Sequence, residues 1–255
     1  MLNEENYYKN NGFNWQNNID DLFIQATHIL YSKVSDKVGD VKNKKILDAA
    51  CGLGKLVPYL SNPIYYGIDI SAENIKICKE KFPNEFLIGD ILSMRDQFTD
   101  NFFDGLVAVE VIEHLTIDEF RLFLKEISRI TKPGSKIVFS TPNLYYLWGM
   151  IPWSFIPIRR RLTLSMMIKG IKRGYVNENY NIPSHHYRFK PRFLKNFISE
   201  FLEVKTMGST YWYNNRAIHK KNEKFQLKIL NFSSKHNPKW CNIGMQLIIE
   251  CVNNK

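Results

Sequence analysis

The sequence predicts a doubly wound α/β fold, in which helices cover both faces of a mostly parallel sheet. Short apolar runs of strand length alternate with segments whose apolar residues recur at helical spacing, from residue 17 to residue 143. The chain has 255 residues, of which 44% are hydrophobic, enough to form the core of one such domain. We therefore expect residues 1–255 to form a single domain.

The expected elements follow one another along the chain. An amphipathic helix over 17–34 opens the fold. Ser71 is placed to cap a helix that runs to Lys81, and Thr116 with Glu119 forms a capping-box pattern at the start of another helix. A short helix is expected to end near Leu60. The remaining expected elements are strands over 46–50, 64–69, 85–91, 102–112, 135–143, 202–207 and 243–252, and a helix over 191–201.

Acidic residues close three of the expected strands. Asp48 ends the first strand and precedes Gly52 and Gly54, while Asp69 ends the second and Asp90 the third. Glycines let the backbone approach a ligand closely, and a carboxylate can accept hydrogen bonds from ribose hydroxyls or an adenine amine. Because parallel strands deliver these groups to one edge of the sheet, the pattern predicts a nucleoside-binding site there.

These motifs resemble those of the class I S-adenosylmethionine (SAM)-dependent methyltransferases. ILDAACGLGKL resembles their glycine-rich motif D-x-x-C-G-x-G, GIDIS their acidic second-strand motif, and GDI their adenine-binding motif, over roughly Lys45 to Asn143. The resemblance implies SAM as the cofactor and a Rossmann-like, seven-stranded sheet whose last strand is antiparallel. A dehydrogenase would normally carry G-x-G-x-x-G, but Val57 occupies the third glycine position. The resemblance implies further cofactor-binding residues at Ile70, Ile91 and Val109.

The segment VEVIEHL, after the fourth strand, contains the candidate catalytic residues. Glu110, Glu113 and His114 would share one face of a helical turn, and with His186 or its neighbour His185 they suit Mg²⁺ or Zn²⁺. E-x-x-E-H followed by a histidine resembles the ubiquinone-biosynthesis O-methyltransferases and the small-RNA 2′-O-methyltransferases, which implies a metal that binds acceptor hydroxyls. Three interpretations stay open: a divalent cation, metal-free catalysis by His114 and His186, or a structural role.

An inserted segment over 144–185 interrupts the alternation of strands and helices. It combines aromatic and apolar residues with six basic and no acidic residues between Leu144 and Asn177, in a chain of net charge +10. Such a segment suits an interfacial contact with an anionic membrane, an acceptor-site lid or an oligomer contact. The six basic residues are Arg159, Arg160, Arg161, Lys169, Lys172 and Arg173.

The sequence predicts a SAM-dependent methyltransferase, most simply an O-methyltransferase acting on a small lipophilic or natural-product hydroxyl. An RNA 2′-O-methyltransferase and a sugar methyltransferase are the alternatives. The RNA enzymes carry T-P-N-x-E-Y-N, whereas TPNLYYLW lacks its Glu and second Asn. The intact glycine loop and Asp69 argue against a non-enzymatic SAM-binding partner.

The expected localisation is cytoplasmic, with membrane association left open. The first residues lack the pattern of a signal peptide, and no run of eighteen apolar residues is present. Four cysteines occur without C-x-x-C pairing, as expected for reduced thiols. The oligomeric state is not indicated.

Overall fold

The computed structural model describes residues 21–144, 172–177, 187–210 and 246–255. Its helices are α2 (Asp21–Val38), α3 (Ala72–Lys81), α4 (Ile117–Ile130) and α7 (Pro191–Ile198), with single 3₁₀ turns η1 (Val57–Tyr59) and η2 (Ile112–His114). Its strands are β1 (Lys45–Ala49), β2 (Ile64–Asp69), β3 (Glu85–Ile88), β4 (Phe103–Val109), β5 (Thr131–Pro142), β6 (Tyr175–Asn177), β7 (Tyr187–Phe189), β8 (Glu203–Ser209) and β9 (Gln246–Val252).

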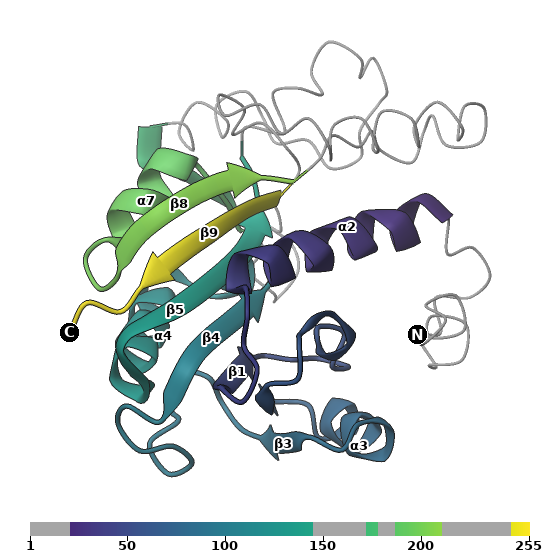
Figure 1. Cartoon of the computed structure of the whole chain (residues 1–255). Helices are drawn as coiled ribbons and strands as arrows, with labels where there is room; N and C mark the ends of the chain where they lie inside the picture. Colours follow the sequence, from purple (N-terminus) through teal and green to yellow (C-terminus); the bar gives the residue numbers. More distant parts are fainter. Residues whose placement is uncertain (1–20, 145–171, 178–186, 211–245) are drawn as a thin grey trace.

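Seven of these strands form one sheet in the order β3-β2-β1-β4-β5-β9-β8 (Figure 1). The strands from β3 to β5 run parallel to their neighbours, whereas β9 runs antiparallel to both β5 and β8. The Rossmann-like sheet with an antiparallel last strand is therefore confirmed.

Alternate residues of the central strands contribute to two apolar layers, one on each face of the sheet. In β4, Val107 packs in the layer that contains α2 and α3, while Leu106 and Ala108 pack in the layer that contains residues of α4 and α7. This period of two follows from the strand pleat. Helices α2 and α4 accordingly lie on opposite faces of the sheet (Figure 1).

Two predicted helix starts are confirmed in detail. The Ser71 side chain accepts a hydrogen bond from the Asn74 backbone N–H at 3.2 Å and caps α3. At α4, Thr116 Oγ1 accepts from the Glu119 N–H at 3.2 Å, and Glu119 Oε2 accepts from the Thr116 N–H at 2.7 Å. This reciprocal pair satisfies backbone donors that the first turn of a helix leaves without intrahelical partners.

The predicted short helix after the glycine loop forms as the 3₁₀ turn η1, with Leu60 as its C-cap residue. Gly52 and Gly54 both have positive φ, so the right-handed helix cannot begin before them. Pro58 has no N–H to donate to an α-helical hydrogen bond, and Leu60 is already extended. The macrodipole of a long helix is therefore not available at this loop.

Strand β6 lies in the predicted insert and forms a small antiparallel sheet with β7, which follows the insert. Aromatic rings fix it to α7: Phe189 stacks on Phe193 with centroids 6.2 Å apart, and Tyr175 contacts the same ring at 5.3 Å. Residues 145–171 and 178–186 lie outside the described residues. They include Arg159, Arg160, Arg161, Lys169, His185 and His186.

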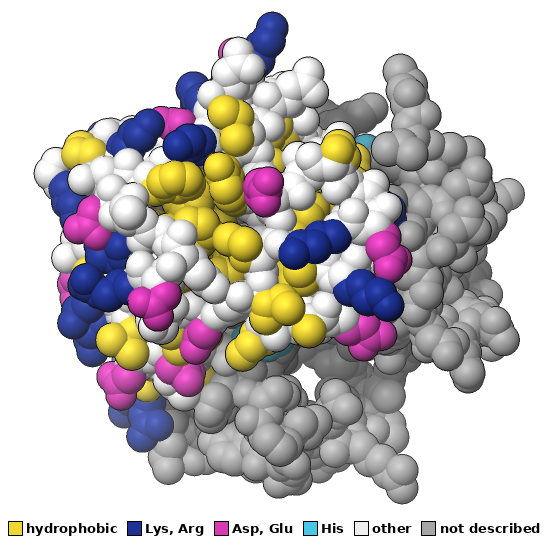
Figure 2. Space-filling view, turned by 90° about the horizontal axis from the view of Figure 1, so that it is seen from below, with side chains coloured by type: hydrophobic (Ala, Val, Ile, Leu, Met, Phe, Trp, Pro, Cys, Tyr) yellow, Lys and Arg dark blue, Asp and Glu magenta, His cyan; other side chains and the backbone are white. Residues whose placement is uncertain are grey.

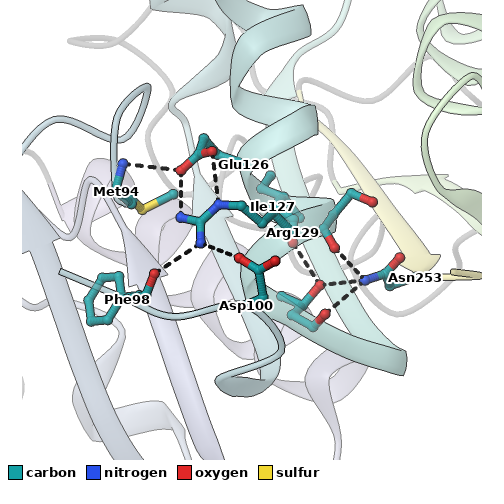
Figure 3. Close-up of polar contacts among 9 residues, drawn as sticks. Met94, Phe98, Asp100, Glu126, Ile127, Arg129 and Asn253 are labelled. Carbon is teal, nitrogen blue, oxygen red and sulfur yellow. Dashed lines mark hydrogen bonds and ion pairs between the residues drawn. The ribbon is translucent and has the colours of Figure 1, made fainter. Parts of the chain in front are cut away.

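A partly buried ion network ties α4 to the loop before β4 (Figure 3). Arg129 donates from Nε and Nη2 to both carboxylate oxygens of Glu126, at 3.1 and 2.8 Å. Its Nη1 donates to the Phe98 carbonyl at 3.0 Å and to Asp100 at 2.8 Å. Beside it, Asn253 donates to backbone carbonyls at the end of α4 and the start of β5. The network joins segments that are distant in sequence.

The surface seen from below carries mixed charges around a central area of apolar side chains (Figure 2). The exposed large apolar residues of the described ranges are Ile64, Ile70, Ile88 and Leu122. No described helix has the length and apolar character that a membrane span needs.

Candidate cofactor-binding and catalytic site

The strand order brings the predicted site residues to one edge of the sheet. Strand β1 lies between β2 and β4, and β3 lies on the far side of β2. The groups that follow these parallel strands therefore succeed one another along the carboxyl edge as Asp90, Asp69, the glycine loop and Glu110. This edge is where doubly wound folds bind their ligands.

Asp69 is the best-anchored carboxylate of this edge. Its Oδ2 accepts a hydrogen bond from the Gly52 N–H at 2.8 Å, and its Oδ1 accepts from the Ser71 N–H at 2.9 Å. Asn74 Nδ2 also donates to Oδ1, at 3.3 Å. Because each carboxylate oxygen has two lone pairs, these contacts fix its orientation and leave acceptor capacity for a ribose hydroxyl.

The glycine loop is shaped for close approach of a ligand. Gly52 has a φ of 54°, and a Cβ at this position would meet no atom within 4 Å, so open space lies beside the backbone. Gly54 has a φ of 67°, and a Cβ there would lie 2.9 Å from the Phe82 ring. Gly52 thus faces the space for a ligand, whereas Gly54 permits packing on the side of α3.

The residues predicted to hold an adenine ring show contrasting exposure. Ile70 is 77% exposed although it is large and apolar, and it directly follows Asp69. Asp90 is also exposed, and its Oδ1 accepts from the Leu92 N–H at 2.9 Å. Ile91 is buried at 8% exposure. An exposed apolar side chain beside a fixed carboxylate suits stacking against a nucleobase.

Asp48 lies within the protein, although the sequence predicted it among the cofactor-binding residues. It is 3% exposed and accepts a hydrogen bond from the Tyr65 hydroxyl at 2.6 Å. Burial raises the pKa of Asp48 to about 7, opposed by the Tyr65 hydrogen bond and reinforced by the nearby Asp69 charge. Asp48 therefore lies enclosed beneath the glycine loop, where its partner is Tyr65.

The structure does not bring the three described metal candidates together as predicted. Glu113 is 1% exposed and its Oε2 accepts from Thr141 at 3.1 Å, whereas His114 is exposed. Glu110 precedes η2, with a φ of 56°. In the described part of the chain, no group of three His, Cys, Asp or Glu residues could hold a metal ion. The fourth candidate, His186, lies outside it.

Polar side chains form a cluster around Glu110, and the sequence did not predict this cluster. Ser140 Oγ donates to Glu110 Oε1 at 2.8 Å and accepts from the Glu110 N–H at 3.0 Å. The Gln246 side chain also hydrogen-bonds the Glu110 carboxyl, and the Arg188 charge acts on it. Burial raises the pKa of Glu110 to about 7 despite these contacts. The sequence signal for this cluster was the polar pair Ser140 and Thr141, which follows the apolar run of β5.

Val109, the last predicted cofactor residue, ends β4 and is partly exposed beside Glu110. It lies opposite Ser140 in the pairing of β4 with β5. The end of β4 is separated from Asp69 by β1. A nucleoside held over β2 and β3 would thus leave the ends of β4 and β5 for the rest of the cofactor and its acceptor.

Comparison with known proteins places the similarity in the same region. Residues 47–139 match the family described as "Methyltransferase domain". Uncharacterized methyltransferases from Bacillus thuringiensis and Bacillus cereus are 36% identical over 131 residues, which cover 47% of this chain and 60% of theirs. The chain thus matches little more than half the length of these curated relatives.

Solved structures share the fold at low sequence identity. A SAM-dependent methyltransferase from Methanosarcina mazei superposes with a TM-score of 0.56 at 16% identity, covering 83% of this chain and 92% of that one. One from Mesorhizobium loti gives a TM-score of 0.61 at 12% identity, covering 88% and 97%. Residues 47–139 are thus similar in sequence to a methyltransferase domain, and the seven-stranded fold is shared with solved SAM-dependent methyltransferases.

Proposed function

We propose that this protein transfers the methyl group of SAM to a hydroxyl of a small acceptor. The observation that carries the proposal is the joint geometry of Asp69 and Gly52, because the carboxylate is fixed by the N–H of the residue that faces open space. Ile70 adds an exposed apolar surface at the same edge. The residues present therefore fit the nucleoside part of SAM.

The chain's own contribution to methyl transfer is binding and orientation. Bound SAM supplies a methyl group that its sulfonium already activates. The protein must hold an acceptor in line with that methyl, and proximity of this kind lowers barriers by roughly 7–11 kcal/mol in ideal cases. The groups after β4 and β5 would position the acceptor, because the nucleoside-binding groups follow β2 and β3.

A hydroxyl acceptor also needs a group to receive its proton. His114 is exposed just after β4, and we propose it for this role, with His186 as the second candidate from the sequence. Positioned bases typically contribute 10²–10⁴-fold in rate. A divalent cation is not included in the proposed mechanism, because the described Glu110, Glu113 and His114 form no metal-binding group.

The lipophilic or natural-product character of the acceptor rests on the insert sequence. One structural neighbour, with a TM-score of 0.55 at 12% identity, is a geranyl diphosphate C-methyltransferase from Streptomyces coelicolor, solved with Mg²⁺. Its reaction places methyl on carbon, so this fold does not by itself select oxygen. The O-methyl assignment is our proposal from the E-x-x-E-H motif.

The proposed cofactor site is tested by replacing Asp69 with alanine and titrating S-adenosylhomocysteine by calorimetry. Loss of charge-assisted hydrogen bonds worth roughly 1.5–3 kcal/mol should weaken binding by about ten- to a hundredfold. Glu73→Ala is the matched control, because Glu73 is an exposed carboxylate in the first turn of α3. Equal affinity in wild type and Asp69→Ala would contradict the site, and no binding by wild type would contradict the function.

The acceptor chemistry is tested by following labelled methyl from SAM into organic-extractable molecules of a cell extract. His114→Ala should lower transfer by about 10²–10⁴-fold with S-adenosylhomocysteine affinity unchanged. Transfer that is lost with a chelator and restored by Mg²⁺ or Zn²⁺ would contradict the metal-free mechanism. Undiminished transfer by His114→Ala would remove His114 from the mechanism.

A further inference from the structure

Two cysteine side chains lie together directly beneath the glycine loop. Cys51 is 7% exposed and Cys78, from α3, is fully buried in the same apolar layer. The Cys51 thiol donates a hydrogen bond to the Cys78 sulfur. Both also approach the Gly52 carbonyl oxygen, Cys78 Sγ at 3.3 Å and Cys51 Sγ at 3.9 Å. The two sulfur atoms thus converge on one backbone group of the proposed cofactor site.

We propose that Cys51 and Cys78 form a disulfide when the protein meets a peroxide, and that this modification weakens SAM binding. The inference rests on the proposed function, because its readout is the cofactor site. The bond would join the loop after β1 to the middle of α3, two segments that now meet only through side-chain packing and hydrogen bonds.

The chemistry requires one peroxide for each disulfide. The Cys78 thiolate attacks one peroxide oxygen, so an S–O bond forms, the O–O bond breaks and hydroxide leaves to take up a proton. The Cys51 sulfur then attacks Cys78 Sγ, so the S–S bond forms and water departs. Two thiols are oxidised and hydrogen peroxide is reduced to two waters.

The surroundings assign the order of attack. The hydrogen bond from Cys51 lowers the pKa of Cys78, although burial and the Asp48 and Asp69 charges oppose it; the Lys81 ammonium adds a smaller lowering effect. The pKa of Cys51 is raised, first by its hydrogen bond to Cys78 and then by burial. Cys78 is therefore the thiol that becomes a nucleophile, and Cys51 is the resolving thiol.

Oxidation would act on the cofactor site through Gly52. A disulfide has no S–H, so the Cys78 thiol donor to the Gly52 carbonyl would be lost. The Gly52 N–H on the other side of that residue is the donor that holds Asp69 Oδ2 at 2.8 Å. A shift of this peptide would displace Asp69 and the open backbone that the ligand approaches. A bound cofactor would conversely hold the loop closed and protect both thiols.

The test compares reduced and peroxide-treated protein. Treatment of the full chain with hydrogen peroxide should produce a Cys51–Cys78 cross-link by peptide mass spectrometry. It should also weaken S-adenosylhomocysteine binding by about tenfold or more in calorimetry, since a tenfold change corresponds to only 1.4 kcal/mol. Dithiothreitol should restore the affinity, and saturating S-adenosylhomocysteine should slow the oxidation.

Matched variants separate this disulfide from general oxidative damage. In Cys78→Ser a hydroxyl can still donate to the Gly52 carbonyl, so reduced-state affinity should stay close to wild type and become insensitive to peroxide. In Cys78→Ala, used if the serine variant folds poorly, peroxide should leave the affinity unchanged from that variant's own reduced value. Cys251→Ser should behave as wild type, because Cys251 lies in β9. Peroxide sensitivity that persists in Cys78→Ser, or a cross-link without loss of affinity, would overturn the proposal.

The proposed function can fail separately from this inference. If reduced wild type does not bind S-adenosylhomocysteine, the cofactor assignment fails, while mass spectrometry still scores the cross-link. If reduced wild type binds and oxidised protein binds equally well, only the redox inference fails.

Discussion

At the scale of single residues, burial makes the contribution of Asp48 to stability depend on pH. Its carboxyl is enclosed below the glycine loop and held by the Tyr65 hydroxyl. Because its pKa is raised from 3.8 to about 7, the folded protein binds this proton more tightly than the unfolded chain does. The stabilising effect is complete below about pH 4 and is lost as the pH rises through about 7.

Asp48→Asn should remove this pH dependence while keeping an acceptor for Tyr65. We expect the free energy of unfolding of the variant, relative to wild type, to rise between pH 4 and pH 7 by an amount on the order of 3–4 kcal/mol, since one pKa unit is 1.36 kcal/mol. Urea titrations at several pH values measure this difference. A constant difference across that range would contradict the assigned pKa.

Several residues were predictable from sequence because their position in a strand fixes where they lie. Asp69, Ile70 and Asp90 follow parallel strands, so period and strand order suffice to bring them to one edge. The sequence alone does not distinguish the roles of Gly52 and Gly54, because these roles depend on which atoms surround each glycine. Asp48 shows the same limit, because a strand end does not reveal that the side chain meets a buried tyrosine.

At the scale of elements, local signals predicted helix starts better than they predicted helix lengths. The capping pairs of α3 and α4 depend on residues three apart, which the sequence displays directly. The expected short helix after Gly54 is limited to one 3₁₀ turn, because two glycines with positive φ precede it and Pro58 has no N–H to donate. Likewise, the helical spacing assumed for Glu110, Glu113 and His114 does not form, because η2 begins only at Ile112 and leaves Glu113 buried and His114 exposed.

The capping box of α4 provides an element-scale prediction. Thr116→Ala removes the Oγ1 acceptor of the Glu119 N–H and should lower the free energy of unfolding by about 1 kcal/mol. Chemical denaturation measures the change, and Lys125→Ala is the control because Lys125 is exposed on the same helix. A loss no greater than that of the control would show that the cap contributes nothing to stability.

At the scale of the whole molecule, the Arg129 network joins α4 to the loop before β4 (Figure 3). Arg129→Met should destabilise the protein by about 3 kcal/mol, because the Arg129 and Glu126 side chains are only 10% and 12% exposed. This expected loss of stability is at the low end for buried pairs because Asp100 is 67% exposed. Arg129 also lowers the pKa of Glu126, so this stabilisation should be lost as the pH falls.

Arg121→Met is the matched control for this prediction. Arg121 lies on the same helix and its side chain is 40% exposed, with ion pairs at 3.7 and 3.9 Å. Exposed pairs contribute roughly 0–1 kcal/mol, so denaturation should show a small loss. Equal losses in the two variants would contradict the structural role assigned to the Arg129 network.

The two edges of the sheet differ across the whole molecule. The carboxyl edge carries the proposed SAM site. The opposite edge holds a cavity of about 240 Å³ between α2 and the first residues of β1, β4 and β5, lined by Lys44, Asp104 and Lys136. These charged groups already contact protein atoms: Lys44 donates to the Asp40 carbonyl, Lys136 to the Lys37 carbonyl, and Asp104 accepts from the Lys45 N–H.

A crystal structure with S-adenosylhomocysteine tests the central claim most directly. We expect ribose hydroxyls on Asp69, the adenine beside Ile70, and the sulfur toward the end of β4 and Glu110. Binding in the cavity near Lys136, or at the carboxyl edge without contact to Asp69, would contradict it.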